Sequence, residues 1–454
     1  MFINREHELS SLNAEYSSKK SSFTVIYGRR RIGKTALIRE YIKGKPSLYF
    51  YATELSISEQ LELFTVEMLK MLNNPALEEI RFPSFERALV FFGEQIKDTK
   101  VVLAIDEYQN LVKVDHSISS VLQKVWDLHL QNKNIHLILC GSIISMMYSE
   151  TLDYSSPLYG RRTGSIHLKQ MPAMTIRQFV KVNDRDLMNV FAAFGTVPRY
   201  LELYNPDKSF YNNVSNQVLS KTGYLYNEVR FLLKEEISAP GTYFQILSII
   251  ASGEQKIGKI AARIGVHASH LTRYLLKLID LDILEKQVPI TESDPTKSKL
   301  GRYRIKDKFF AFWFYYVYRN LSLLELSNIK PVLDKVKADF NQKFVSFAFE
   351  DYVKELLLHH PEKYLGFIPE KIGRWWNNRQ EIDQVAFNDE HVAFIECKWQ
   401  NQQVGYEVYQ DMKRIAETLE FQQKHQYIIF AQKGFKTSLK ESDCKLYSYL
   451  KSKS

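Results

Sequence analysis

The chain has 454 residues, which is too long for one ordinary domain of about 100–200 residues. Its 45% hydrophobic and 25% charged residues exclude an intrinsically disordered chain and are typical of globular domains. The formal net charge of +9 favours a polyanionic partner such as nucleic acid, although many proteins of similar charge bind none.

Apolar segments and cysteines narrow the class of protein further. The longest apolar run, Phe309–Tyr318, is much shorter than the roughly 20 residues of a membrane-spanning helix. Charged residues between Arg5 and Glu8 interrupt any apolar leader segment. The cysteines have neither the number nor the spacing of a disulfide framework or a zinc site; they are Cys140, Cys397 and Cys444. We therefore expect a soluble cytoplasmic protein with no membrane partner.

Residues 1–170 alternate short apolar runs with amphipathic helical stretches. The runs are Phe23–Tyr27, Ser47–Tyr51, Val101–Ile105 and His136–Cys140. This alternation predicts a parallel sheet with helices on both faces.

A phosphate-binding loop follows the first of these runs. The segment from Gly28 to Thr35 fits GxxxxGK[ST], and a helical stretch begins at Ala36. In such a loop the backbone N–H groups wrap the phosphates, Lys34 reaches the β/γ oxygens, and the Thr35 hydroxyl ligates Mg²⁺. The predicted ATP-contacting residues of the loop are Gly28, Arg29, Arg30, Arg31, Ile32, Gly33, Lys34, Thr35 and Ala36.

Two acidic residues end the third run, where ligands bind in open α/β sheets. Asp106 is predicted to hold Mg²⁺ through water, and Glu107 to orient and deprotonate the attacking water. The fourth run ends just before Ser142, which is predicted to lie beside the γ-phosphate as a sensor. A solvated acidic turn is the ordinary interpretation of such a pair, but the upstream phosphate-binding loop favours the catalytic one.

Three arginines are candidates for neutralising charge during phosphoryl transfer. Arg161 and Arg162 lie in the turn of residues 156–163, and Arg199 lies in the turn of residues 195–200. A structural or surface role is the alternative for each of them.

These motifs together resemble the archaeal ATPase family, which is related to AAA+ and STAND ATPases. The resemblance covers about residues 1–210. It is carried by an F-x-x-R-E-x-E-L opening at Phe2–Leu9, the P-loop, DEYQ at Asp106–Gln109, GS at Gly141–Ser142, SPLYGRRTG at Ser156–Gly164 and G-x-VPRYL at Gly195–Leu201. It implies that the N-terminal segment lines an adenine pocket and that Arg199 is a sensor arginine. Thr196 departs from the paired glycines more usual in the family.

The middle of the chain is predicted to be mainly helical. Residues 171–235 suit a helical lid, and residues 236–320 suit a winged helix, because three helical patterns precede two short β-like runs. The second helix of a helix-turn-helix pattern would carry His267, His270, Arg273 and Lys277. These donors are consistent with DNA binding, and equally with a protein-contact module.

Residues 335–454 form a separate predicted α/β domain with a cluster of charged residues. Two strands joined by a turn would bring Asp383 beside Glu396 and Lys398. Two hard oxygen ligands suit Mg²⁺ or Mn²⁺, and Lys398 could position or deprotonate a water that attacks a phosphodiester. A solvated charge ladder is the structural alternative.

The order helix, strands, helix, strand with D…ExK resembles the PD-(D/E)xK restriction-endonuclease-like fold. That resemblance implies metal ligands Asp383 and Glu396, catalytic Lys398, and Glu350 as an accessory acid. It also implies a second possibility, a degenerate nuclease fold that only binds.

The predicted fold class is therefore α/β: a P-loop AAA+-like ATPase with a helical lid, a winged helix and a C-terminal restriction-endonuclease-like domain. The leading hypothesis is a homo-oligomeric ATPase that couples ATP and Mg²⁺ to metal-dependent cleavage or processing of nucleic acid, with DNA favoured, in defence or mobile-element biology. The alternative is a STAND-like switch in which nucleotide occupancy controls assembly and the nuclease-like domain only binds.

Overall fold

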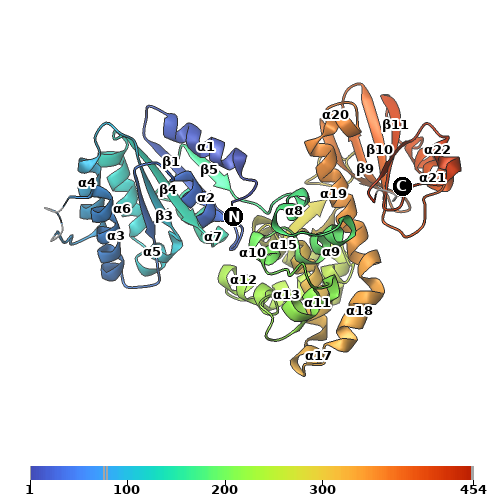
Figure 1. Ribbon diagram of the computed structural model, residues 1–454, viewed down its shortest axis with the longest axis horizontal. Coiled ribbons are helices and arrows are strands. Elements are labelled where there is room, and N and C mark those ends of the chain that lie inside the picture. Colours follow the sequence, from blue (N-terminus) through green and yellow to red (C-terminus); the bar gives the residue numbers. More distant parts are fainter. Residues whose placement is uncertain (1, 75–76, 78–79, 451–454) are drawn as a thin grey trace. The chain divides into compact units, whose positions relative to one another are not determined.

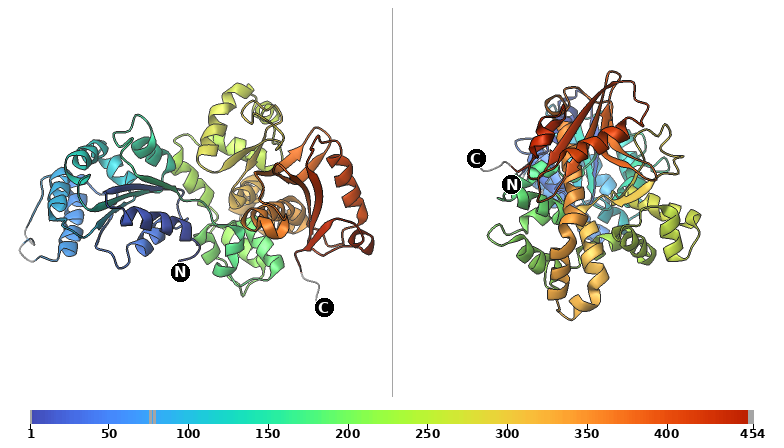
Figure 2. Two further views of the ribbon diagram at one scale, coloured as in Figure 1. Left: turned by 90° about the horizontal axis from the view of Figure 1, so that it is seen from above. Right: turned by 90° about the vertical axis from the view of Figure 1, so that its right-hand side faces the viewer.

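The computed structural model describes residues 2–74, 77 and 80–450. The chain divides into two compact units, Met1–Met171 and Pro172–Ser454 (Figures 1 and 2). Within the described residues, no helix has both the length and the apolar character needed to cross a bilayer.

A five-stranded parallel sheet forms the centre of the first unit. Its strands are β1 (Ser22–Tyr27), β2 (Ser47–Tyr51), β3 (Val101–Asp106), β4 (Ile135–Gly141) and β5 (Gly164–His167), in the order β2-β3-β4-β1-β5. The parallel arrangement brings the carboxyl ends of all these strands to one edge. The sheet predicted from the first four runs is confirmed, whereas β5 was not predicted.

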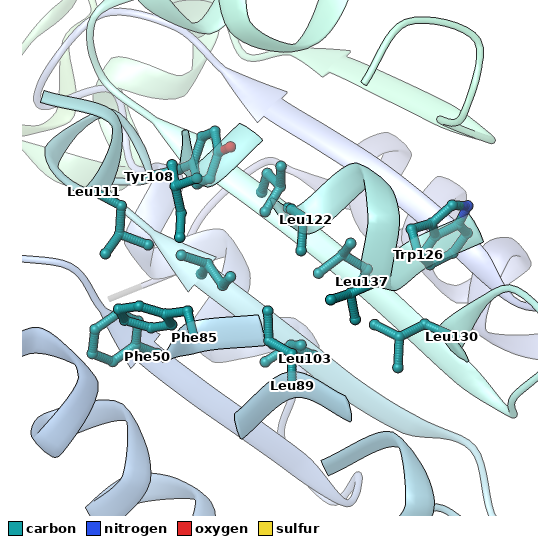
Figure 3. Close-up of a cluster of buried hydrophobic side chains, with 14 of the residues drawn as sticks. Phe50, Phe85, Leu89, Leu103, Tyr108, Leu111, Leu122, Trp126, Leu130 and Leu137 are labelled. Atoms are coloured by element: carbon teal, nitrogen blue, oxygen red, sulfur yellow. The ribbon is translucent and has the colours of Figure 1, made fainter. Parts of the chain in front are cut away.

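Helices cover both faces of this sheet. They are α1 (Glu6–Ser17), α2 (Lys34–Tyr41), α3 (Ile57–Leu72), α4 (Phe85–Gln95), α5 (Gln109–Val114), α6 (Ile118–Val125) and α7 (Ile144–Met147), with short helical turns η2 (Trp126–Leu130) and η3 (Tyr148–Leu152). Along β3, Val102 and Ala104 pack toward α1 and α2, whereas Leu103 packs on the other side with α3, α4 and α6. Figure 3 shows this second core. Burial on both faces explains why β3 is apolar at every position from Val101 to Ile105.

The second unit begins with helices. They are η4 (Ala173–Thr175), α8 (Ile176–Phe179), α9 (Asp184–Phe194), α10 (Pro198–Glu202), α11 (Phe210–Asn213), η5 (Val214–Leu219) and α12 (Glu228–Glu236). The hairpin segment follows, with α13 (Gly241–Ala251), α14 (Ile257–Ile264), α15 (Ala268–Asp280) and the antiparallel strands β6 (Leu284–Gln287) and β7 (Arg302–Ile305). It has the three helices and the hairpin that the sequence predicts.

An aromatic helical connector leads to the last part of the chain. It comprises α16 (Lys308–Phe312), η6 (Trp313–Val317), η7 (Tyr318–Asn320), α17 (Leu321–Glu325), α18 (Lys330–Phe340) and η8 (Asn341–Val345). Trp313 is fully buried and its indole N–H donates to the backbone oxygen of Tyr226, 2.7 Å away. This contact ties the connector to the preceding helices.

The C-terminal sheet is mixed, in the order β12-β11-β10-β9-β8. Its elements are α19 (Ser346–His359), α20 (Pro361–Tyr364), β8 (Lys371–Trp376), β9 (Glu381–Phe387), β10 (His391–Lys398), α21 (Tyr406–Ala416), β11 (Lys424–Ala431), α22 (Thr437–Lys440) and β12 (Lys445–Ser448). Helices α19 and α21 lie on opposite sides of the sheet (Figures 1 and 2). The predicted turn at Asn388 and Asp389 is present and joins antiparallel β9 and β10.

Helix α21 is shorter than its apolar pattern. Apolar residues at steps of three or four from Val404 to Leu419 are typical of one continuous helix, but α21 spans only Tyr406–Ala416. Val404 instead forms a parallel bridge with Phe435, and Gly405 in extended conformation begins the helix. A tertiary backbone pairing therefore overrides the local periodicity.

Candidate functional site

The predicted phosphate-binding loop lies between β1 and α2. Gly28 and Gly33 have φ angles of 151° and 98°, in the region that favours glycine. The Lys34 ammonium donates to the backbone oxygens of Gly28 (2.8 Å) and Arg29 (3.0 Å). Burial lowers the pKa of Lys34, because the charged ammonium is desolvated inside the folded loop. An anionic phosphate in the loop would offset this cost.

Thr35 and Asp106, the two predicted magnesium ligands of this unit, lie in contact. The Thr35 hydroxyl donates to a carboxylate oxygen of Asp106 over 2.7 Å. Tyr49 on β2 donates its hydroxyl to the same oxygen over 2.9 Å. Asp106 is fully buried at the carboxyl end of β3. The P-loop helix and the β3 carboxylate are thus joined at the place where a Mg²⁺–phosphate complex would bind.

Glu107 and Ser142 also come together, from the ends of adjacent strands. The Ser142 hydroxyl donates to the Glu107 carboxylate over 2.7 Å, and the Gln109 amide contacts both side chains. The Arg30 Nε–H donates to the Ser142 hydroxyl over 3.4 Å. A side chain at Gly141 would overlap those of Gln109 and Met147, so a larger residue there would displace Gln109 from Glu107 and Ser142. The predicted base and sensor therefore form one hydrogen-bonded group beside the P-loop.

The N-terminal opening is anchored to the same loop. Arg5 is buried, and it donates to the backbone oxygens of Ile32 (3.1 Å) and Lys169 (2.7 Å) while pairing with Glu8. These contacts hold the start of the chain against the P-loop. A role of this segment in an adenine pocket stays a prediction.

The C-terminal cluster brings Asp383, Glu396 and Lys398 together. The Lys398 ammonium contacts the Glu396 carboxylate and lies 4.0 Å from Asp383 Oδ2. The backbone N–H of Cys397 donates to the same Asp383 oxygen over 2.9 Å and fixes its direction. Both carboxylates are less than a tenth exposed, which is inconsistent with a solvated charge ladder.

Arg374 on β8 is a fourth member of the cluster. One of its terminal nitrogens lies 2.8 Å from Glu350 on α19, and the other lies 3.9 Å from Asp383. The register shift between Gly373 and Trp375 falls at this arginine, and such irregularities redirect side chains. Arg374 therefore engages Glu350, the predicted accessory acid.

Burial and like charge perturb the acids of the cluster. Burial, together with the neighbouring Asp383, raises the pKa of Glu350 and of Glu396. Burial opposes the charge of Lys398, but Glu396 and Asp383 outweigh it and raise the pKa of the lysine. Lys398 is consequently an ammonium at neutral pH, suited to orienting a water or a phosphate rather than to removing a proton.

The described residues contain no group of three or more His, Cys, Asp or Glu placed to hold a metal ion. The cluster thus offers two carboxylates, Asp383 and Glu396. Their donor chemistry still fits Mg²⁺, which commonly binds one or two carboxylates and takes its other ligands from water and substrate phosphate.

Comparisons with known proteins support an ATPase domain in the first unit. Residues 2–204 match the family described as an ATPase domain predominantly from Archaea, and residues 313–415 match a family of archaeal and bacterial proteins of unknown function. An uncharacterized protein of Methanocaldococcus jannaschii is 36% identical over 98% of this chain and 99% of its own length. The chain belongs to the archaeal ATPase family.

Two further proteins are similar to this archaeal ATPase, one in a short stretch of sequence and one in fold. An uncharacterized ATP-binding protein of M. jannaschii is 42% identical over 45 residues, which are 10% of this chain and 76% of that protein. A Walker-type ATPase of Pyrococcus abyssi has the same fold, with a TM-score of 0.53 and 18% identity over 69% of this chain and 96% of that one. The protein is an ATP-binding ATPase with a P-loop AAA+-like fold and a further C-terminal mixed-sheet domain.

The predicted arginines of this archaeal ATPase occupy different surroundings. Arg161 donates three hydrogen bonds of 2.7–3.0 Å to the carboxylate of Asp127. It lies near the amino end of β1, and hence at the sheet edge opposite the P-loop. Arg162 has a buried guanidinium nitrogen without a hydrogen-bond partner. Arg199, in the second unit, pairs with Glu202 at 3.1 Å. None of these contacts assigns a catalytic role, which stays a prediction.

The predicted donors of the hairpin segment are accessible. His267, His270 and Arg273 are exposed and Lys277 is half-buried, while Leu271, Leu275 and Leu278 are buried. His267 caps the helix by accepting the backbone N–H of Ser269. DNA binding by this helix stays a prediction.

Some residues of both sites were not singled out from the sequence. Gln109 lies within the DEYQ motif, so the motif itself could have suggested a role beside Glu107. Tyr49 lies in an apolar run with no distinguishing signal, and Arg374 lies in a strand that the sequence did not reveal. Their roles depend on sheet order, which links residues distant in the chain.

Proposed function

We propose that this ATPase couples nucleotide hydrolysis to divalent-metal-dependent cleavage of nucleic acid, with DNA as the favoured substrate. The observation that carries the proposal is the convergence of buried Asp383 and Glu396 with Lys398. The net charge of +9 supports a polyanionic substrate. Defence or mobile-element biology is the setting that this combination of activities suggests.

The cluster residues have separable roles in this proposal. Asp383 and Glu396 would hold Mg²⁺ or Mn²⁺, which supplies Lewis-acid stabilisation of the phosphodiester. The Lys398 ammonium would orient the attacking water and neutralise charge on the phosphate. The water oxygen bonds to phosphorus and releases its proton to solvent, the bond to the leaving oxygen breaks, and that oxygen takes up a proton from solvent.

A metal-supplemented cleavage assay tests the proposal. Plasmid and linear DNA are incubated with the full chain and Mg²⁺ or Mn²⁺, with and without ATP. We expect cleavage by the wild type and its loss in Asp383→Asn and Lys398→Ala. Asp389→Asn in the exposed turn and Lys424→Ala on β11 are matched controls that should cleave normally. Cleavage that survives both cluster substitutions would exclude this site.

A second candidate function follows from the ion pairs of the cluster. Lys398 and Arg374 already neutralise the acids that surround them, which suits a nuclease-like domain that only binds. The ATPase would then act as a STAND-like switch whose nucleotide state controls assembly. It predicts a change in particle mass between ADP and a non-hydrolysable ATP analogue, measured by analytical ultracentrifugation, with DNA left intact.

We also propose that the protein forms homo-oligomers, because an arginine of one copy would then act on the nucleotide bound to its neighbour. Arg162 would act on the nucleotide of a neighbouring copy. Arg161 is the second candidate, and Arg199 would act as the sensor within its own chain. Specific ATPase activity should then rise with protein concentration in the wild type and stay flat in Arg162→Ala. A flat wild-type profile across the assembly range would contradict an activity shared between subunits.

A further inference from the structure

A cavity of about 590 Å³ lies in the second unit, lined by the hairpin strands, the aromatic connector, α19 and β8. Its volume falls within the range of roughly 300–1,000 Å³ typical of small-ligand sites. None of the site residues predicted from the sequence lines it, and it shares Arg374 with the carboxylate cluster.

Positive charge dominates the cavity lining. Five cationic side chains and one carboxylate, Glu381, line it; the cations are Arg302, Arg304, Lys308, Lys343 and Arg374. Arg304 and Lys308 share a single carboxylate, that of Asp351. Lys343 is half exposed and lies 3.8 Å from Asp339. Arg302 pairs with Glu381 at 3.1 Å, and Arg374 pairs with Glu350. Glu381 lines the cavity, whereas the other paired acids, Asp351, Glu350 and Asp339, do not, so the lining itself carries excess positive charge and favours an anion.

An aromatic ring provides a second kind of contact. Phe347 is 39% exposed, which is unusual for a phenylalanine in a cavity wall. The guanidinium carbons of Arg304 and Arg374 lie 5.6 Å and 5.9 Å from the centre of its ring. An accessible aromatic ring among cations is the arrangement that binds single-stranded nucleic acid, because the ring stacks on a base while the cations pair with phosphates.

The cavity adjoins the carboxylate cluster through Arg374. The same guanidinium lines the cavity, pairs with Glu350 and lies 3.9 Å from Asp383. Glu381, which also lines the cavity, precedes Asp383 by two residues on β9. A strand that fills the cavity would thus have its next phosphate close to the cluster.

We propose that this cavity binds one nucleotide unit of single-stranded DNA, with the base stacked on Phe347 and the phosphates paired with Lys343 and Arg302. The assignment of that strand as the substrate of the cluster rests on the proposed nuclease function. A free nucleoside monophosphate presents the same base and phosphate chemistry, so the test must separate the two sources.

Binding is measured by fluorescence anisotropy of a short labelled oligothymidylate in EDTA, where metal-dependent cleavage cannot occur. The full chain carries Lys34→Ala so that the P-loop does not take up nucleotide. We expect Phe347→Ala and Phe347→Leu to weaken binding roughly 5- to 100-fold, because base stacking is lost. Lys343→Glu should weaken binding and lower the salt slope by about 0.7, the value for one phosphate contact on a single strand.

Lys337→Glu is the matched control, because Lys337 is equally exposed, lies 3.8 Å from an acid on α18 and does not line the cavity. It should bind as the parent does, and thermal melting checks that each variant folds. Equal binding by the parent and the Phe347 variants, or equal weakening by Lys337→Glu and Lys343→Glu, would overturn the proposal. Displacement of the oligonucleotide by AMP at similar concentrations would assign a free nucleotide instead of a strand.

Two readouts keep this proposal separate from the nuclease function. Loss of binding in Phe347→Ala, with no cleavage by the wild type, would support the cavity and reject the nuclease. Normal cleavage together with unchanged binding in Phe347→Ala would support the nuclease and reject the cavity.

Discussion

The carboxylate of Glu107 accepts a 2.7 Å hydrogen bond from the hydroxyl of Ser142, which links the ends of β3 and β4. Glu107 also has a φ of 55°, in the left-handed region that non-glycine residues seldom adopt. The Gln109 amide donates to the Glu107 carboxylate and to the Ser142 hydroxyl. These hydrogen bonds fix the direction of the carboxylate, as a water-orienting group would require.

Glu107→Gln should abolish most ATP hydrolysis while ATP binding remains. The amide keeps the size of the side chain but cannot accept the proton of water, so we expect a loss of about 10²- to 10⁴-fold in phosphate release. Calorimetry measures ATP affinity in the same preparation. Glu54→Gln, on the exposed surface, is the control and should hydrolyse ATP normally. Full turnover by Glu107→Gln would reject the assignment of the base.

Lys34→Ala should lose ATP affinity. The substitution removes a charge-assisted contact worth about 1.5–3 kcal/mol, or roughly 10- to 150-fold in the dissociation constant. Lys43→Ala is a matched control, because Lys43 follows the same helix but is exposed and pairs with Glu40. Unchanged ATP affinity in Lys34→Ala would refute the phosphate site.

The two glycines of the P-loop should differ in their tolerance of alanine. A methyl group at Gly28 would overlap the backbone oxygen of Leu168, whereas one at Gly33 would meet nothing within 4 Å. We expect Gly28→Ala to displace the loop and abolish ATP binding. Gly33→Ala should suffer only the strain of its positive φ, about 1–2 kcal/mol. Titration with a fluorescent ATP analogue compares the two, and equal affinities would contradict this account.

His136 should make the protein less stable in mild acid. Its ring is fully buried between Thr24 (2.8 Å) and the hydroxyl of Tyr41 (2.7 Å). Burial lowers the pKa of His136 from 6.5 to about 3. Between pH 6.5 and about 3, His136 is therefore protonated in the unfolded chain but neutral in the folded chain. The free energy of unfolding consequently falls by about 1.4 kcal/mol for each unit by which the pH drops in this range.

Urea denaturation at several pH values measures this dependence. His136→Gln keeps a polar group between the same partners but has no proton to gain, so its stability should fall less steeply between pH 6.5 and about pH 5 than that of the wild type. Parallel slopes for the two proteins would show that His136 does not control the acid response.

The sequence predicted the strands whose residues are buried on both faces, because burial makes every position apolar, as in Val101–Ile105. It did not reveal β5 and β12, which are four residues long and lie at sheet edges. It did not reveal β8 either, where Arg374 and a glycine interrupt the apolar pattern. Such strands depend on the neighbours that they pair with more than on their own composition.

The C-terminal cluster likewise contains contacts that local sequence predicts and contacts that depend on tertiary packing. Asp383, Glu396 and Lys398 were predictable as neighbours because a short turn at Asn388 joins their strands and limits the register. The ion pair of Arg374 with Glu350 was not, because sheet order and the position of α19 decide it. Local spacing therefore identified the acids, and only tertiary packing showed which cation accompanies them.

Two consecutive residues of α19 hold different parts of the second unit. Glu350 pairs with Arg374 on β8, and Asp351 pairs with Arg304 on β7. One turn of α19 thereby connects the hairpin to the C-terminal sheet through two ion pairs. The carboxylate cluster is therefore connected to β7 through Arg374, two adjacent acids of α19 and Arg304.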